Sequence, residues 1–464
     1  MSIKVAITKI RSILKDRIKT SRAILREHAK SEVHYPEFLP DAVAFVNSTQ
    51  EVSEILKICN EEMCPIIAWG TGTALEGHSL ASNGGISLNM MNMNKIIKIN
   101  SDDMDVIVQP GVQREQLNEH LRASGLFFSV DPGANASLGG MAATRASGTT
   151  SVRYGTMKEN VLALEIVTAD GRIIRTGTRA RKSSSGYDLT KLIVGSEGTL
   201  AIITELTLKL HGRPEAMSAA LCAFPSIDSA VQTVISTIQA GVPIARMEFI
   251  DSETAKILNG YSKETMENLP HLFLEFHGSQ ASVMEQAELV KEIASEFQSS
   301  GFQWSYKEED RNRIWKMRHN ALYAYKAHYA NCTLIATDVC VPISRLAEII
   351  HETQLDIQQS GISGPIIGHV GDGNFHSTLI IRNENKTDIK VAHELSHRMN
   401  ERALTMEGTV SGEHGIGIGK IKYMEKEHGE AWDLMSSIKT ALDPNSILNP
   451  GKLVRQNKDL SLAQ

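Results

Sequence analysis

The chain lacks the features that define several protein classes. It has only five cysteines in 464 residues, and no two of them form a Cys-x-x-Cys pair. This pattern argues against a disulfide framework or a zinc knuckle and favours a reducing compartment. No apolar run approaches the roughly 18 residues of a membrane-spanning helix. The net charge of -6 argues against nucleic acid as the main partner.

What is present is ordinary for a soluble globular protein, with 42% hydrophobic and 22% charged residues. A chain of 464 residues is too long for one hydrophobic core, so two or more domains are expected. The first 30 residues are basic, with Asp16 and Glu27 as their only acidic residues. They lack the apolar core of a secretion signal. Two interpretations stay open: a presequence or membrane-surface helix, and a solvated helix that packs on the first domain.

The first half of the chain alternates short apolar runs with turn signals. A helix is expected at about 50–62, with Thr49 as its N-cap. Strands are expected at 42–48, 65–69, 86–89, 106–109, 161–168 and 201–210. This half therefore indicates an α/β or α+β fold.

The second half opens after Arg213-Pro214, which marks a domain boundary. Helices are expected at about 226–239 and 281–298, and strands at 219–224, 245–250 and 272–276. This order predicts an antiparallel sheet with helices on one face.

Four glycine-rich segments lie in the first half. The first, Gly70-x-Gly72-x-x-x-x-Gly77, is not the dinucleotide fingerprint, because its third glycine is displaced. Similar segments lie at 131–140, 146–155 and 195–200. Such loops present backbone N–H groups to a pyrophosphate, so the four are either ordinary turns or the lining of an elongated cofactor. The run 415–420 is not a Walker loop.

The most informative stretch brackets a Gly-Asp-Gly-Asn turn between His369 and His376. Glu413 and His414 follow between two further glycines. Imidazole nitrogens and a carboxylate oxygen suit a divalent transition metal. The remaining histidine, His414, is placed to move a proton. The pattern indicates an enzyme.

These motifs, in this order, resemble those of the FAD-linked D-2-hydroxyacid dehydrogenases of the vanillyl-alcohol-oxidase fold group, D-lactate dehydrogenase (cytochrome) type. The resemblance runs from about 40 to 453 and is strongest at 69–78, 130–156, 195–204, 368–376, 412–420 and 442–452. It implies an α+β fold. The implied parts are an N-terminal helical segment 1–36, a PCMH-type FAD-binding domain 37–213, and a FAD-linked oxidase C-terminal cap domain 214–464. The cap domain would hold a ferredoxin-like sheet, and its tail 442–464 would return to FAD.

The resemblance implies noncovalent FAD, because His78 follows the glycine loop, whereas relatives with covalent flavin carry a histidine nearer its start. The residues implied to contact FAD are Trp69, Gly70, Thr71, Gly72, Thr73, Ala74, Gly77, His78, Pro132, Gly133, Ser137, Gly139, Gly140, Ala143, Ser147, Gly148, Tyr154, Gly155, Glu197, Gly198, Ile202, Ile203 and Asn449.

The resemblance also implies metal ligands at His369, His376 and Glu413, with zinc or manganese expected as the divalent metal and iron also compatible with these ligands. His414 would be the general base and Arg318 would bind the substrate carboxylate. Relatives that oxidise 2-hydroxyglutarate have a lysine where this chain has Ala336. This departure favours a monocarboxylate.

The implied reaction is oxidation of D-lactate, or a similar small D-2-hydroxy acid, to the 2-oxo acid. Electrons would pass to a quinone, a cytochrome or an electron-transfer flavoprotein. Alternatives are a D-2-hydroxyglutarate or glycolate dehydrogenase, a non-redox transferase like alkyl-glycerone-phosphate synthase, and a flavin-free metallohydrolase. The expected location is cytoplasmic, or mitochondrial in a eukaryote. Peripheral contact with the inner membrane and a homodimer both stay open.

Overall fold

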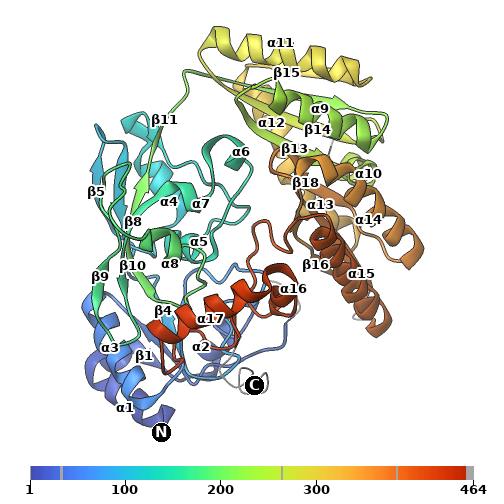
Figure 1. Ribbon diagram of the computed structural model, residues 1–464. Helices are drawn as coiled ribbons and strands as arrows, with labels where there is room; N and C mark the ends of the chain where they lie inside the picture. The colour runs from blue at the N-terminus through green and yellow to red at the C-terminus, as the bar shows by residue number, and fades with distance from the viewer. Residues whose placement is uncertain (1, 32–34, 263–264, 383–384, 456–464) are drawn as a thin grey trace. The chain divides into compact units, whose positions relative to one another are not determined.

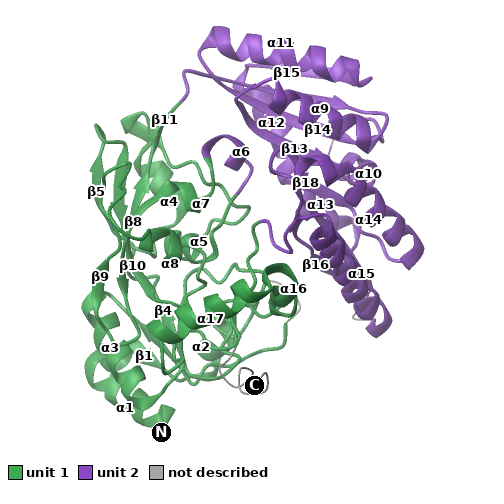
Figure 2. Ribbon diagram, viewed as in Figure 1, with its two compact units in different colours: residues 1–147, 155–213, 413–464 green, residues 148–154, 214–412 purple. Residues whose placement is uncertain are grey.

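The computed structural model describes residues 2–31, 35–262, 265–382 and 385–455 (Figure 1). The chain forms two compact units, shown in Figure 2. Unit 1 comprises residues 1–147, 155–213 and 413–464, and unit 2 comprises 148–154 and 214–412. The chain passes to unit 2 at Pro214. The returning segment begins at Glu413, well before 442, and the end of the expected tail, 456–464, lies outside the described residues.

Unit 1 begins with a four-stranded sheet in the order β1-β2-β4-β3, in which β4 is parallel to both β2 and β3. These strands are β1 (Ile18–Lys19), β2 (Ala42–Phe45), β3 (Ile66–Trp69) and β4 (Ile86–Asn89). Two helices, α1 (Ile3–Leu14) and α3 (Thr49–Glu62), contribute to its core. Short α2 (Arg22–Glu27) lies between β1 and β2 in the chain.

Helix α1 buries Ala6, Ile10 and Leu14 in this core, which supports the interpretation of the basic segment as a helix packed on its domain. The predicted N-cap of α3 was wrong by one residue. Ser48 has extended backbone, and its hydroxyl accepts a hydrogen bond from the Glu51 N–H at 3.3 Å, so Ser48 is the cap.

A second, antiparallel sheet of unit 1 has the order β5-β6-β10-β8-β9. Its strands are β5 (Ile96–Asn100), β6 (Asp105–Val108), β8 (Val161–Val167), β9 (Ile173–Arg175) and β10 (Ile202–Lys209). The short strands β7 (Leu126–Phe127) and β11 (His211–Gly212) pair separately. The remaining helices of unit 1 are α4 (Arg114–His120), α5 (Leu138–Thr144), α7 (Met157–Asn160), α8 (Leu189–Ile193), α16 (Met424–His428) and α17 (Glu430–Leu442).

Unit 2 is built on one large sheet in the order β15-β12-β14-β13-β18-β19-β16, with β17 also paired to β19, and all neighbours are antiparallel. The strands are β12 (Ala216–Ala223), β13 (Ile244–Ile250), β14 (His271–Gly278), β15 (Ser300–Ser305), β16 (Cys332–Ala336), β17 (Val339–Cys340), β18 (Ile366–His369) and β19 (Asn374–Arg382). The order β15-β12-β14-β13 is that of a ferredoxin-like sheet.

Helices cover both faces of this sheet, so the prediction of helices on one face was wrong. Leu272 and Leu274 of β14 join the core formed with α9 (Ile227–Gln239), α11 (Gln280–Glu296), α14 (Leu346–Ser360) and α15 (Lys386–Thr405). Phe273, which points the opposite way, joins the core formed with α10 (Ser252–Tyr261), α12 (Glu308–His319) and α13 (Ala321–His328). A nearly continuous apolar run such as that of β14 is typical of a strand buried on both sides.

The short helix α6 (Ser151–Tyr154) also belongs to unit 2.

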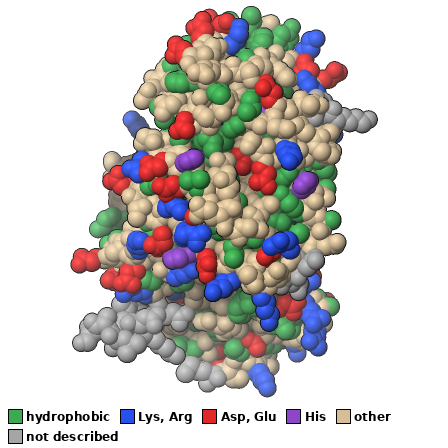
Figure 3. Space-filling model, turned by 90° about the vertical axis from the view of Figure 1, so that its right-hand side faces the viewer, with side chains coloured by type: hydrophobic (Ala, Val, Ile, Leu, Met, Phe, Trp, Pro, Cys, Tyr) green, Lys and Arg blue, Asp and Glu red, His purple; other side chains and the backbone are tan. Residues whose placement is uncertain are grey.

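Among the described residues, no helix is both long and apolar enough to cross a membrane. Figure 3 shows acidic and basic side chains interspersed, as expected when 54 acidic residues nearly balance 48 basic ones.

Candidate active site

In unit 1 the first glycine loop, which follows β3, lies against the start of α5. A Cβ added at Gly70 would lie 2.2 Å from Ser137 Oγ, and one added at Gly139 would lie 2.4 Å from Pro110 Cβ. The Ser137 N–H donates to Thr71 Oγ1 at 3.4 Å. Two segments that the sequence assigned to the cofactor therefore meet, and their glycines permit an approach that no side chain would allow.

The loop ends at His78, which lies beside the buried carboxylate of Glu197. His78 Nε2 is 3.2 Å from Glu197 Oε1. The backbone N–H groups of Ile416 and Gly417 donate to the same carboxylate at 2.7 and 2.8 Å. Burial alone would raise the pKa of Glu197, but His78 and the two backbone donors outweigh burial and lower the pKa. Glu197 thus stays ionised and binds together segments far apart in the sequence.

The C-terminal segment closes this network. Asn449 Nδ2 donates to the carbonyl oxygens of His78 and Glu197 at 3.0 and 2.7 Å. Lys452 Nζ donates to Leu80 O and to Asn449 Oδ1, both at 2.7 Å. Burial lowers the pKa of Lys452 to about 8, although Glu197 acts in the opposite direction. The sequence identified Asn449, but it did not identify Lys452 as a buried cation.

Three alternating glycines, Gly415, Gly417 and Gly419, pack directly on the first loop. A Cβ at Gly417, where φ is +49°, would lie 2.0 Å from Glu76 O, and one at Gly415 would lie 2.6 Å from His78 Nε2. A Cβ at Gly419 would collide with the Glu76 carboxylate and with the hydroxyl of Tyr35. The repeat that resembles a nucleotide loop is therefore a close-packing device.

The first glycine loop, Ser137, Gly139, Glu197 and Asn449 together form a cradle in unit 1. Its residues fit a large ligand with both polar and aromatic parts. Among the residues that the structure describes, no hydrogen-bond partner reaches the buried Trp69 Nε1 or His78 Nδ1. Such donors and acceptors are costly to bury unless a ligand or water satisfies them. Together with the glycine loop, they suit a dinucleotide such as FAD.

Other residues predicted to contact the cofactor make contacts within the protein itself. The Glu197 N–H donates to Ala143 O at 2.8 Å, which holds α5 against the 195–200 segment. Ser147 Oγ donates to Glu413 Oε2 at 3.1 Å. The side chains of Ile202 and Ile203 are buried in two separate apolar cores.

The predicted segment 146–155 is divided between the two units: Gly148 and Tyr154 belong to unit 2, and Gly155 belongs to unit 1. His277 Nε2 donates a hydrogen bond to Glu275 Oε1 at 2.8 Å, so its Nδ1 is the acceptor of the ring. The Tyr154 hydroxyl donates to this Nδ1 at 2.7 Å. Tyr154 is thereby fixed to the sheet of unit 2.

In unit 2, His369 and His376 lie close together on the β18–β19 hairpin. Their ring centroids are 5.4 Å apart and the rings are nearly perpendicular, at 78°. His376 Nδ1 donates to Thr337 O at 2.9 Å, because a carbonyl oxygen can only accept. His369 Nδ1 donates to Glu248 Oε1 at 2.6 Å. In this tautomer each ring keeps its lone pair on Nε2, as a metal-binding histidine requires.

Glu248 also holds Arg318, the predicted carboxylate-binding residue. Arg318 Nη2 donates to Glu248 Oε2 at 2.7 Å, and both side chains are buried. Among the described residues, no acceptor reaches the buried Arg318 Nε. Sequence reasoning missed Glu248, although one carboxylate inside the apolar strand Ile244–Ile250 was a signal.

Asp338 fixes the chain just before Glu413 and His414. It accepts hydrogen bonds from Asn374 Nδ2 at 2.7 Å and from Ser411 Oγ at 2.9 Å. A Cβ at Gly412 would lie 2.1 Å from Asn374 Nδ2. The hairpin that carries the two histidines therefore anchors residues 411 and 412. Ala336, at the end of β16, offers no charge to a ligand.

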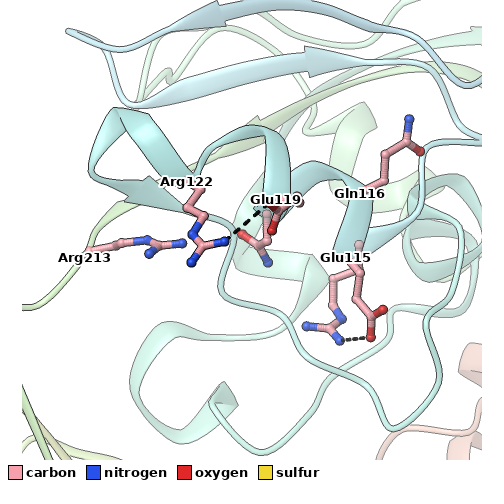
Figure 4. Close-up of a pocket in the computed structure, with 7 residues that line it drawn as sticks. Glu115, Gln116, Glu119, Arg122 and Arg213 are labelled. Atoms are coloured by element: carbon pink, nitrogen blue, oxygen red, sulfur yellow. Dashed lines mark hydrogen bonds and ion pairs between the residues drawn. The ribbon is translucent and has the colours of Figure 1, made fainter. Parts of the chain in front are cut away.

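A separate groove of about 590 Å³ lies beside α4 in unit 1 and contains none of the predicted site residues (Figure 4). Its Arg114 and Arg122 form ion pairs with Glu115 and Glu119 at 3.1 and 3.6 Å. These exposed pairs indicate a solvated helix surface.

Two families match the chain. "FAD binding domain" matches residues 40–177, and "FAD linked oxidases, C-terminal domain" matches residues 213–453. The chain is 46% identical to "Probable D-lactate dehydrogenase, mitochondrial" of Danio rerio, over 98% of this chain and 92% of the relative. It is 42% identical to "D-lactate dehydrogenase [cytochrome], mitochondrial" of Arabidopsis thaliana, over 97% of this chain and 80% of the relative.

The fold also matches that of a solved p-cresol methylhydroxylase, with a TM-score of 0.80 and 18% identity, over 97% of this chain and 96% of the other. The predicted α+β class, with a PCMH-type FAD-binding domain and a FAD-linked oxidase C-terminal domain, is confirmed. The glycine-rich cradle, the histidine pair and the two relatives agree: the chain belongs to the FAD-linked oxidases and is an enzyme of the D-lactate dehydrogenase (cytochrome) type.

Proposed function

We propose that this enzyme oxidises D-lactate, or a similarly small D-2-hydroxy acid, to the corresponding 2-oxo acid. The observation that carries the proposal is the buried arrangement in unit 2, where Glu248 joins Arg318 to His369. A guanidinium suits the carboxylate of such a substrate, and an imidazole pair suits a metal that would bind its hydroxyl. The names of the two relatives support the same substrate.

FAD would lie on the cradle of unit 1, held without a covalent bond. Its contacts would come from the first glycine loop, Ser137, Gly139, Glu197 and Asn449. When bound, FAD accepts the two electrons that the substrate gives up. The chain's own contribution is to bind the cofactor and keep a preformed polar surface around it.

The metal ligands would be His369, His376 and Glu413, with zinc or manganese as the ion. Both imidazoles already have the tautomer that a metal needs. Such an ion lowers the pKa of a hydroxyl group bound to it. Residues 411 and 412, which directly precede the third proposed ligand, Glu413, are anchored through Asp338 and Asn374.

Arg318 would bind the substrate carboxylate through donors that Glu248 does not occupy, including Nε. His414 would remove the proton of the substrate hydroxyl. Ala336 supplies no cation for a second carboxylate, which favours a monocarboxylate over 2-hydroxyglutarate. Glycolate and D-2-hydroxyglutarate are the alternative substrates. A non-redox transferase is less well supported, because it gives the oriented histidine pair no role.

The electrons would leave through a separate acceptor: a quinone, a cytochrome or an electron-transfer flavoprotein. In a eukaryotic cell the location would be mitochondrial, as for the two relatives. Contact with a membrane surface and assembly into a homodimer are further proposals, for which biochemical fractionation and measurement of the mass in solution are the tests.

Steady-state reduction of an artificial electron acceptor tests the substrate assignment. The assay compares D-lactate, L-lactate, glycolate and D-2-hydroxyglutarate at equal concentrations. We expect D-lactate to give the highest kcat/KM, with L-lactate inactive. A higher kcat/KM for D-2-hydroxyglutarate would overturn the argument from Ala336.

A further inference from the structure

We propose that Glu248 is a positioning residue that couples substrate binding to metal binding. The inference rests on the proposed function, since it takes Arg318 as the substrate-binding residue and His369 as a metal ligand. Each of these side chains is held by a different oxygen of one carboxylate: Oε1 accepts from His369 Nδ1 at 2.6 Å, and Oε2 accepts from Arg318 Nη2 at 2.7 Å.

The burial of Glu248 shows that this carboxylate is not there for solubility. Its side chain is 1% exposed, and those of Arg318 and His369 are 9% and 13% exposed. A buried carboxylate is expensive unless it is paired and hydrogen-bonded. Strand β13 places it between α12, which carries Arg318, and β18, which carries His369 and pairs directly with β13.

Holding both His369 and Arg318 requires two hydrogen-bond acceptors at position 248. An ionised carboxylate accepts at both oxygens, whereas a glutamine amide of the same shape has one acceptor and one donor. If the amide oxygen faced His369, its NH₂ would face the Arg318 guanidinium, donor against donor. If the NH₂ faced His369, the imidazole would have to move its proton to Nε2, the atom that a metal needs. Either orientation disables one of the two binding groups.

The first arm of the test measures metal binding without substrate. Metal-stripped, FAD-containing enzyme is titrated with Zn²⁺ in competition with a chromogenic chelator, and the titration is repeated with Mn²⁺. We expect Glu248→Gln to bind the ion about 10–100-fold more weakly than wild type, the usual effect of removing a partner of a metal ligand. Glu285→Gln, an exposed site on α11, should bind like wild type.

The second arm measures D-lactate turnover at ion concentrations that fill the site in each variant. The substrate carboxylate does not react, so Arg318 contributes binding that is equal in the ground and transition states. We expect Glu248→Gln to raise the KM for D-lactate by about tenfold or more, with a smaller change in kcat. A purely structural role would lower thermal stability and leave ion affinity and KM unchanged.

Glu248→Asp provides the conservative variant. It keeps both acceptors and the charge but is one methylene shorter, so it should recover part of the ion affinity that Glu248→Gln loses. It also replaces Glu248→Gln in both arms if that variant does not fold.

Three outcomes are decisive. Wild-type ion affinity and KM in Glu248→Gln would overturn the coupling while leaving the proposed function intact. Wild-type enzyme that binds neither ion would overturn the proposed metal and the metal half of the inference, and KM would then decide the Arg318 half. Loss in both arms, partly recovered by Glu248→Asp, is the result that the inference predicts.

Discussion

Replacing Gly417 with alanine should weaken the packing that holds the FAD cradle together. Gly417 has φ of +49°, and its Cβ would lie 2.0 Å from the backbone oxygen of Glu76. Because that oxygen belongs to the main chain, the two segments must separate. The hydrogen bond from the Ile418 N–H to Glu76 O, 2.8 Å long, would be lost with the movement.

The magnitude follows from three contributions. A left-handed alanine costs about 1–2 kcal/mol. The overpacked Cβ adds about 1–3 kcal/mol, and the lost hydrogen bond adds about 1 kcal/mol. Together they destabilise unit 1 by about 3–6 kcal/mol. Gly125→Ala is the matched control: its φ is +70°, but nothing lies within 4 Å of its Cβ, so only the backbone cost of about 1–2 kcal/mol applies.

The assay is chemical unfolding followed by the fluorescence of released flavin, with FAD retention after dialysis as a second readout. We expect Gly417→Ala to unfold at clearly lower denaturant concentration than Gly125→Ala and to lose FAD more readily. If both variants unfold at the same midpoint, the close packing of the glycine repeat on the first loop is refuted.

Three further predictions concern titration, burial and catalysis. Lys452 has a pKa lowered to about 8 from 10.5, so the unfolded state binds more protons between these values and stability rises with pH there. Relative to Lys452→Met, wild type should gain on the order of 3 kcal/mol between pH 8 and 10.5 in denaturant titrations; a flat difference would contradict the lowered pKa. Tyr154→Phe leaves buried His277 without its donor and should cost about 1–3 kcal/mol in thermal unfolding, whereas the exposed Tyr187→Phe should cost nothing measurable. His414→Ala should lower kcat about 10²–10⁴-fold with FAD retained, and near-normal turnover would remove His414 from the mechanism.

Local sequence signals predicted nine strands and the helices α3, α9 and α11, because apolar runs and turn residues act over a few positions. Strand β4 was predicted at its observed bounds, and α9 within one residue. Helix α10 was missed, and no strand or helix was given bounds after residue 298, so β15–β19 and α12–α17 came from the structure alone. The second covered face of the sheet was missed because a run buried on both sides has no period to read.

The candidate site shows where sequence reasoning ends. The histidine motif and the glycine loops are local and could be recognised. Glu248 contacts His369 across 121 positions, and Glu197 accepts from Ile416 across 219. No residue near either glutamate in the sequence indicates which partner it contacts, because such pairs are set by strand order and loop packing. Those long-range contacts give both carboxylates their roles.

Anaerobic bleaching of the flavin absorbance shows whether bound FAD takes electrons from a small D-2-hydroxy acid. Purified enzyme is mixed without oxygen with D-lactate, L-lactate or D-2-hydroxyglutarate. We expect D-lactate to bleach the flavin band within one turnover and L-lactate to leave it unchanged. A flavin band that none of these acids bleaches would contradict the proposed reaction while leaving the fold and the cofactor in place.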